Sequence, residues 1–175
     1  MKYRQKLLLF SGIFLGIAFA FFTWLGIQLA APVPVASHPG GYYRDSFLLK
    51  LDAPANGKIY YTTDGSTPTA QSEPYQDGIL LQDRSGEANH YTAYQNVMVN
   101  WQEYTPDPTP VPKGTVVRAI YINNWGVSSE ILNQTYFIGI PQPEEGYTIS
   151  LIFEEDTLFG EDGIYVTGRE YDSWY

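Results

Sequence analysis

The most informative segment of this sequence is Ile59-Tyr60-Tyr61-Thr62-Thr63-Asp64-Gly65-Ser66-Thr67-Pro68-Thr69. β-Branched and aromatic side chains fill residues 59–63, which predicts a strand. Asp64 and Gly65 then predict a tight turn, because glycine adopts positive φ without strain and aspartate accepts a hydrogen bond from a nearby backbone N–H. Pro68 keeps the residue before it extended. We therefore expect a strand, a tight turn and a second extended segment.

Four further segments have the pattern of strands. In residues 46–53, Phe47, Leu49 and Leu51 alternate with more polar neighbours, which predicts a half-buried strand. The other three segments are residues 78–81, 115–122 and 130–138, with an Asn-Asn-Trp-Gly turn between the last two. Short strands separated by Gly, Pro and Asx turns, with almost no helical periodicity, predict an all-β antiparallel sandwich over residues 42–139.

Together with Ser72 and Tyr75, residues 59–69 resemble the chitobiase/β-hexosaminidase carboxy-terminal domain and the related fibronectin-type-III-associated module. The Thr-Val-Val-Arg-Ala-Ile run at 115–120 and the pairs Ser128-Ser129 and Thr135-Tyr136 fall where that family has its later strands. The resemblance implies an immunoglobulin-like accessory domain of exported bacterial proteins. It implies no glycosidase activity, because catalysis in that family belongs to a separate domain.

This sequence departs from the family by a long insertion at residues 83–112. Its middle has the i, i+3, i+4, i+7 spacing of a short amphipathic helix, at Tyr94, Val97, Met98 and Trp101, although Val97, Val99 and Trp101 fit a strand equally. A proline at every second position from 106 to 112 predicts a stiff, extended return.

Aromatic rings of this insertion are candidate ligand contacts, because exposed rings stack on sugar faces. The candidate binding residues are Trp101, Tyr104, Tyr94 and Trp125, the last in its own turn, with Tyr91 as a neighbour and Glu103 or Asp107 as hydroxyl acceptors. The alternative is that the helix packs these rings onto the sheet, which is the commoner role of an aromatic helix stripe. A glycan is therefore one expected partner, and packing is the competing interpretation.

The amino end has the pattern of a membrane anchor. Lys2, Arg4 and Lys6 precede 25 uncharged residues, from Leu7 to Ala31. At about 1.5 Å per residue, such a helix crosses a hydrocarbon core of about 30 Å. The positive-inside rule keeps residues 1–6 in the cytoplasm, so we expect a single-pass signal anchor in the cell membrane with the main domain extracytoplasmic. A cleaved secretory signal is the alternative, but its apolar region is usually shorter and no clean cleavage site follows.

Two further features belong to the predicted anchor, one within the helix and one directly after it. Gly12, Gly16 and Ala20 form a small-residue stripe that would suit a helix–helix dimer, although glycine and alanine are common in membrane helices. Residues 32–41 are uncharged and rich in Pro and Gly, which predicts an extended spacer that lifts the domain off the membrane.

The composition shifts in residues 140–175, where positions 144–172 carry nine acidic residues and one basic residue. Residues 147–153 predict another strand. From Tyr147 to Gly168 the series resembles the opening of the CotH spore-coat kinase-like family, which implies an atypical kinase that uses ATP and a divalent metal. The catalytic residues of that family lie beyond this opening, so none is assigned here. We expect the chain to be the amino-terminal part of a longer surface protein.

Composition excludes several classes of function. After residue 31 the chain has 7 basic and 19 acidic side chains, which argues against nucleic-acid binding. It has no cysteine and two histidines, and the candidate carboxylates Asp52, Asp64 and Asp77 sit beside strands or turns, where aspartate is common. We therefore predict no catalytic residue, no cofactor and no metal site. The expected function is that of a membrane-anchored, extracytoplasmic, non-catalytic module, with a carbohydrate-binding accessory module as the alternative.

Overall fold

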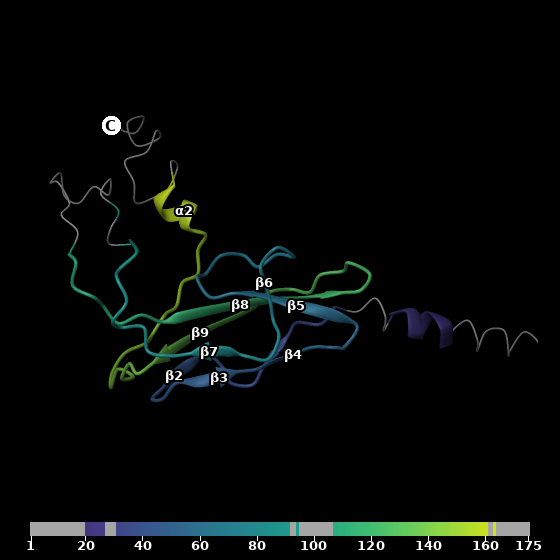
Figure 1. Ribbon diagram of the computed structural model, residues 1–175, viewed down its shortest axis with the longest axis horizontal. Helices are drawn as coiled ribbons and strands as arrows, with labels where there is room; N and C mark the ends of the chain where they lie inside the picture. The colour runs from purple at the N-terminus through teal and green to yellow at the C-terminus, as the bar shows by residue number, and fades with distance from the viewer. Residues whose placement is uncertain (1–19, 27–30, 92–93, 95–106, 161–162, 164–175) are drawn as a thin grey trace, which may run out of the picture.

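The computed structural model describes residues 20–26, 31–91, 94, 107–160 and 163, and these are mainly β-structure (Figure 1). In chain order the elements are β1 (Val35–Ala36), β2 (Gly41–Tyr43), β3 (Phe47–Leu49), β4 (Leu51–Asp52), β5 (Gly57–Thr62), β6 (Glu73–Pro74), β7 (Ile79–Leu81), β8 (Thr115–Asn123), β9 (Leu132–Ile138) and α2 (Glu155–Phe159). The expectation of an all-β domain is confirmed for the described part of the chain.

The larger sheet has the strand order β2-β9-β8-β5-β6. Its central strand, β8, pairs antiparallel with β5 and β9, with Tyr60 opposite Ile120 and Val117 opposite Gln134. At one edge β2 pairs with β9 in parallel. The expectation of a purely antiparallel sandwich is wrong at this edge. The reason is that β2 reaches the sheet from the other layer and is not joined to β9 by a hairpin.

The second layer is made of two short strand pairs, β1-β4 and β3-β7. Residues 46–53, which we expected to form one strand, divide at Lys50 into β3 and β4, and each half pairs with a different strand. The predicted alternation is observed, because Leu49 and Leu51 are buried and Leu48 is exposed.

The core lies between the two layers. Its buried members are Leu49, Leu51, Ile59, Ile79, Leu81, Val117, Ala119, Tyr121, Tyr136 and Ile138. Two of them are tyrosines whose hydroxyls need partners inside the protein. The Tyr121 hydroxyl donates to Asn56 Oδ1 at 2.5 Å and the Tyr136 hydroxyl donates to the His38 carbonyl at 2.8 Å. Both buried tyrosine hydroxyls therefore have a hydrogen-bond partner within the protein.

Of the amino-terminal region, residues 20–26 are helical and the rest of positions 1–30 lies outside the described residues. Within the described part of the chain, no helix combines the length and the apolar content that a membrane span needs. Most of the predicted anchor, residues 7–31, therefore falls outside the description, and so do Gly12 and Gly16 of the small-residue stripe.

Residues 32–41 differ from the predicted spacer. Val35 and Ala36 form β1, paired with Asp52 and Leu51 of β4. Pro34 is buried, and Ala31 and Ala36 pack against the core. Pro32 and Pro34 precede the two paired residues, so neither proline removes a backbone donor from the β1–β4 pair. This segment is therefore part of the sandwich.

Residues 147–153 are extended but form no strand with any described residue. Their apolar side chains point outward, and the exposed fractions are 99% for Tyr147, 77% for Ile149 and 71% for Leu151. Their polar neighbours contact the larger sheet instead. The side of this segment that faces the protein is the polar one, and the expectation of a strand over residues 147–153 is wrong because its backbone pairs with no described strand.

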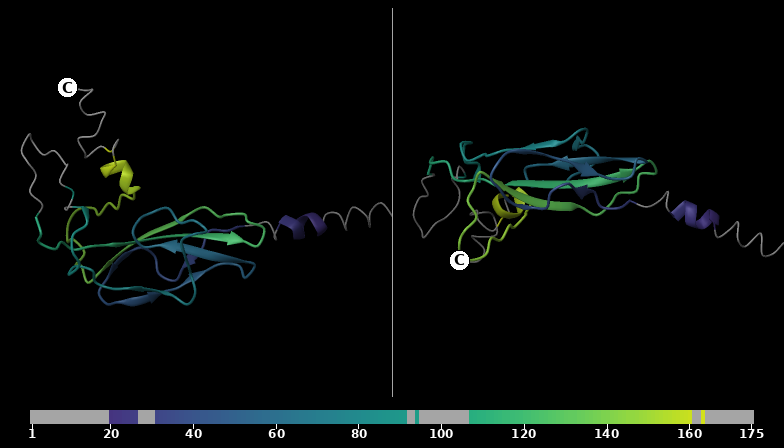
Figure 2. Two further views of the ribbon diagram at one scale, coloured as in Figure 1. Left: turned by 45° about the horizontal axis from the view of Figure 1, so that its top comes forward. Right: turned by 90° about the horizontal axis from the view of Figure 1, so that it is seen from below.

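The two ends of the sandwich carry different segments. The helical residues 20–26 and the β8–β9 hairpin lie at one end, and α2 lies at the other in each view (Figures 1 and 2). The turn after β5, the loop after β7 and the start of β8 share the end where α2 lies.

Candidate functional site

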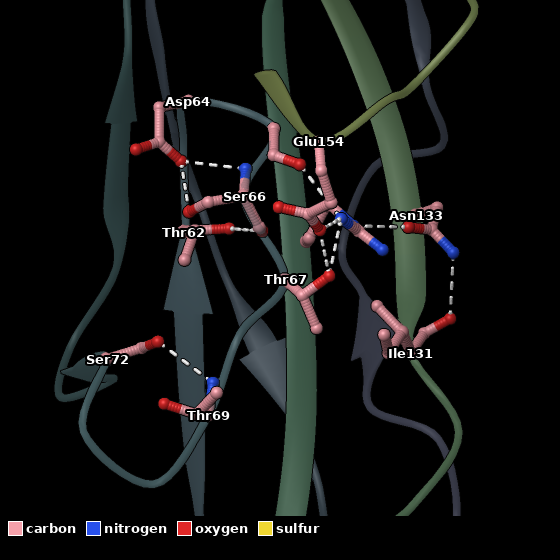
Figure 3. Close-up of polar contacts among 11 residues, drawn as sticks. Thr62, Asp64, Ser66, Thr67, Thr69, Ser72, Ile131, Asn133 and Glu154 are labelled. Carbon is pink, nitrogen blue, oxygen red and sulfur yellow. Dashed lines mark hydrogen bonds and ion pairs between the residues drawn. The ribbon is translucent and has the colours of Figure 1, made fainter. Parts of the chain in front are cut away.

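The turn that follows β5, residues 64–69, is hereafter the signature turn. Asp64 Oδ1 accepts hydrogen bonds from the backbone N–H of Ser66 at 3.0 Å and from its hydroxyl at 2.6 Å (Figure 3). These bonds, chiefly the one from the Ser66 hydroxyl, hold the pKa of Asp64 below its ordinary value. Gly65 has φ of +91°, and the Thr62 hydroxyl donates to the Ser66 carbonyl at 2.7 Å. The turn is thus fixed by its own short polar side chains.

Arg118, at the middle of β8, holds the signature turn to the sheet. Its Nη1 donates to the Gly65 carbonyl at 2.8 Å and to the Thr67 hydroxyl at 3.1 Å. Its Nε donates to Asn133 Oδ1 on β9 at 2.9 Å. The Arg118 side chain is only 13% exposed. A single guanidinium therefore connects three elements that are distant in sequence.

The fourth partner of Arg118 is a carboxylate from beyond the sandwich. Glu154 Oε1 lies 3.2 Å from Arg118 Nη1 and also accepts from the Thr67 hydroxyl (Figure 3). A guanidinium and a hydroxyl that point at one oxygen form a charge-assisted recognition site for a carboxylate. The site binds a segment of this chain.

Residues 147–154, hereafter the crossing segment, run over the larger sheet strand by strand. The Thr148 hydroxyl lies 2.7 Å from the Tyr42 hydroxyl on β2, and the Ser150 hydroxyl lies 2.7 Å from the Thr135 hydroxyl on β9. Glu154 then reaches Arg118 on β8. The order of these contacts, β2, β9, β8, follows the order of the strands in the sheet.

The insertion holds the segment that follows. The Phe159 ring of α2 stacks on Tyr94, with ring centroids 4.5 Å apart, and on Tyr91, with centroids 5.3 Å apart. Nearby, His90 Nε2 and Glu155 Oε2 are 3.1 Å apart. Stacked aromatic pairs stabilise a structure by more than the burial of their apolar area alone would give. The crossing segment and α2 are therefore attached at both a charged and an aromatic point.

The predicted ligand residues have different positions. Tyr94 is half-buried against Phe159, so its ring packs, although on α2 and not on the sheet as we expected. Trp125 is 63% exposed in the turn between β8 and β9. Trp101 and Tyr104 lie outside the described residues, and so does the helix predicted between Tyr94 and Trp101.

Sequence reasoning missed Arg118, Glu154 and Phe159. One signal was present, because Arg118 is the single charge in an otherwise apolar strand, and such a side chain requires polar partners. Its partners come from residues 65, 67, 133 and 154, and no local pattern connects these positions.

The described residues hold no cluster of three or more His, Asp or Glu side chains that could bind a metal. Beside the signature turn lies an open hollow of about 380 Å³, and the residues around it include Tyr61, Asp64 and Glu73. Its lining is mainly polar, and Asp64 is already bonded to Ser66.

A family model described as Fn3 associated matches residues 49–136, which is half of the chain. No curated protein and no solved structure matches significantly. The comparisons give no support to the resemblance of the tail to CotH proteins. The matched range includes the signature turn, Arg118 and Asn133, and it excludes the crossing segment and α2.

Proposed function

Because the chain belongs to the Fn3-associated family, we propose that its β-sandwich is a non-catalytic accessory module that positions the chain following it. The observation that carries this proposal is the attachment of residues 147–159 to the outer face of the larger sheet and to the insertion. Arg118 and Thr67 bind Glu154, and Tyr91 and Tyr94 bind Phe159. A flexible tether would have no such contacts.

The finer proposal is that this module is anchored in a membrane and faces the extracytoplasmic side, as the amino-terminal part of a CotH-like surface protein. Support for the anchor comes from three basic residues followed by 25 uncharged ones. Support for the parent protein comes from the CotH-like series between Tyr147 and Gly168.

The attachment is tested by hydrogen exchange of the full chain in detergent. Glu154→Gln and Phe159→Ala should each raise the exchange rate of amides in residues 147–160 several-fold, because each removes one of the two fixed points. The urea midpoint of the sandwich should not change, since no core residue lies in this segment. Phe153→Ala is the matched control, since this neighbouring phenylalanine is 45% exposed. Equal exchange in all three variants would contradict the proposal.

The second candidate function is carbohydrate binding, and the hollow beside the signature turn favours it. Around this open, polar hollow lie a tyrosine, whose ring can stack on a sugar face, and two carboxylates, which can accept hydrogen bonds from sugar hydroxyls. A glycan array should then give at least one ligand, and Glu73→Gln should weaken its binding about ten-fold or more with the melting temperature unchanged. Binding that is unaffected by Glu73→Gln would place any sugar elsewhere.

A further inference from the structure

The end of the sandwich from which the predicted anchor leaves carries Asp52, opposite Val35 of β1, and three segments without a charged residue. These segments are residues 31–36, 53–57 and 123–127, with the sequences Ala-Pro-Val-Pro-Val-Ala, Ala-Pro-Ala-Asn-Gly and Asn-Asn-Trp-Gly-Val. They are hereafter the uncharged end. The chain as a whole has a net charge of −9, and none of its acidic residues lies in these three segments.

Strand register brings these segments together. Val35 of β1 lies opposite Asp52 of β4 in an antiparallel pair, so the residues before Val35 and those after Asp52 run toward the same end. Gly57 at the start of β5 lies opposite Asn123 at the end of β8. The backbone N–H of Asn124 also donates to the Asn56 carbonyl at 2.8 Å. In both figures the helical residues 20–26 lie at this end.

The hairpin tip, residues 123–127, presents Trp125 on a rigid support. Asn123 Oδ1 accepts from the backbone N–H groups of Trp125 and Val127, each at 3.0 Å. The N–H of Gly126 donates to the Asn123 carbonyl at 2.9 Å, and Gly126 has φ of +78°. Although its backbone is fixed in this way, the Trp125 side chain is 63% exposed and Val127 is 40% exposed. An ordered turn therefore holds a large apolar ring in solvent.

No spacer separates the sandwich from the predicted anchor, which ends at Ala31. Ala31, the last residue of the apolar run, packs against the sandwich core, and Pro34 is already buried. If residues 7–31 cross the membrane, the uncharged end meets the bilayer surface directly. Tryptophan is enriched at the headgroup level of membranes because its ring is apolar and its indole N–H is polar. The nearest charges, Asp52 and Lys58, flank the turn at 53–57 with opposite signs.

We propose that Trp125 and Val127 of the hairpin tip insert into the headgroup layer of the membrane and hold the sandwich upright on it. This inference rests on the proposed anchor, and the partner is a lipid surface. The opposite end would then be the membrane-distal one. Strand register places there the charged loops Arg44-Asp45, after β2, and Asp83-Arg84, after β7, together with the signature turn, and α2 lies at the same end (Figure 1). The crossing segment and α2 would thus be displayed on the side away from the bilayer.

The experiment uses the absence of cysteine, which lets a single spin label be placed at will. The full chain is reconstituted in vesicles of phosphatidylethanolamine and phosphatidylglycerol, with the label at Trp24→Cys, Asn124→Cys or Ser46→Cys in turn. Relaxation by oxygen and by a water-soluble nickel complex reports the depth of each label. Labels at 24 and 124 should be more accessible to oxygen than to nickel, and the label at 46, at the opposite end, should show the reverse.

Two results distinguish a failure of the proposed membrane contact from a failure of the proposed anchor. A label at 24 in lipid with a label at 124 that behaves like the one at 46 would overturn the membrane contact alone. A label at 24 in water would overturn the anchor and the contact together. In the Asn124→Cys chain, Trp125→Ser should shift the label toward nickel accessibility. Leu80→Ser, which removes a side chain of similar exposure on β7, should leave the label unchanged. A shift with Leu80→Ser and none with Trp125→Ser would also overturn the inference.

Discussion

Gly65 lies where the chain turns away from β5, and its conformation is the only reason it must be glycine. Its φ is +91°, and a Cβ built there would meet no atom within 4 Å. Gly65→Ala should therefore lower the free energy of unfolding by about 1–2 kcal/mol through backbone strain alone. Urea denaturation measures this change. Gly86→Ala is the control, because its Cβ also meets nothing and its φ lies outside the left-handed region. Equal midpoints for the two variants would mean that the turn is assigned wrongly.

Tyr136 makes the stability of the sandwich depend on alkaline pH. Burial, with a smaller contribution from Tyr43, raises the pKa of the Tyr136 hydroxyl to about 12. In the unfolded chain the group titrates near its ordinary value of about 10. The folded state therefore keeps the proton that the unfolded state loses, so stability is full below pH 10 and falls as pH rises toward 12.

Tyr136→Phe tests this dependence. The variant should lose about 1 kcal/mol at neutral pH, because the bond to the His38 carbonyl disappears. Between pH 10 and 12 its urea midpoint should fall less steeply than that of the parent. Parallel slopes would show that other groups, such as the buried Tyr121, dominate the alkaline transition.

At the scale of elements, local pattern predicted the strands that are rich in β-branched and aromatic side chains, even where their partners are distant in sequence. The run at 115–122 became β8, and residues 59–63 became most of β5, because β-branched and aromatic side chains suit both strands at the centre of a sheet. The strand β1 was missed because Pro32 and Pro34 make its sequence look like a linker. It forms because β4 offers it an unpaired edge.

The candidate site was only partly visible in the sequence. The Asp64–Ser66 bonds join residues two positions apart, so the residue types indicated a turn of this kind. The contact between Arg118 and Glu154 joins residues 36 positions apart, and it depends on the path that the crossing segment takes over the sheet. Residue types in 147–153 predicted a strand, but they did not show that this segment would cross the sheet through its polar side chains.

The whole molecule has a direction, because its two ends differ in chemistry. One end has the uncharged segments 31–36, 53–57 and 123–127, and the other carries the signature turn, the loop after β7 and α2. The core is confined to residues between 31 and 138, so the sandwich is complete without the crossing segment.

The parallel pairing of β2 with β9 has a mechanical consequence. A pull between residue 31 and residue 140 draws β2 toward one end of the sandwich and β9 toward the other, along the lengths of the strands. Their ladder, from Gly41–Tyr136 to Tyr43–Ile138, is then loaded in shear, and its hydrogen bonds share the force instead of opening one by one as in a peeled hairpin. Tension on the tail should therefore detach residues 147–159 first, while the sandwich resists extension.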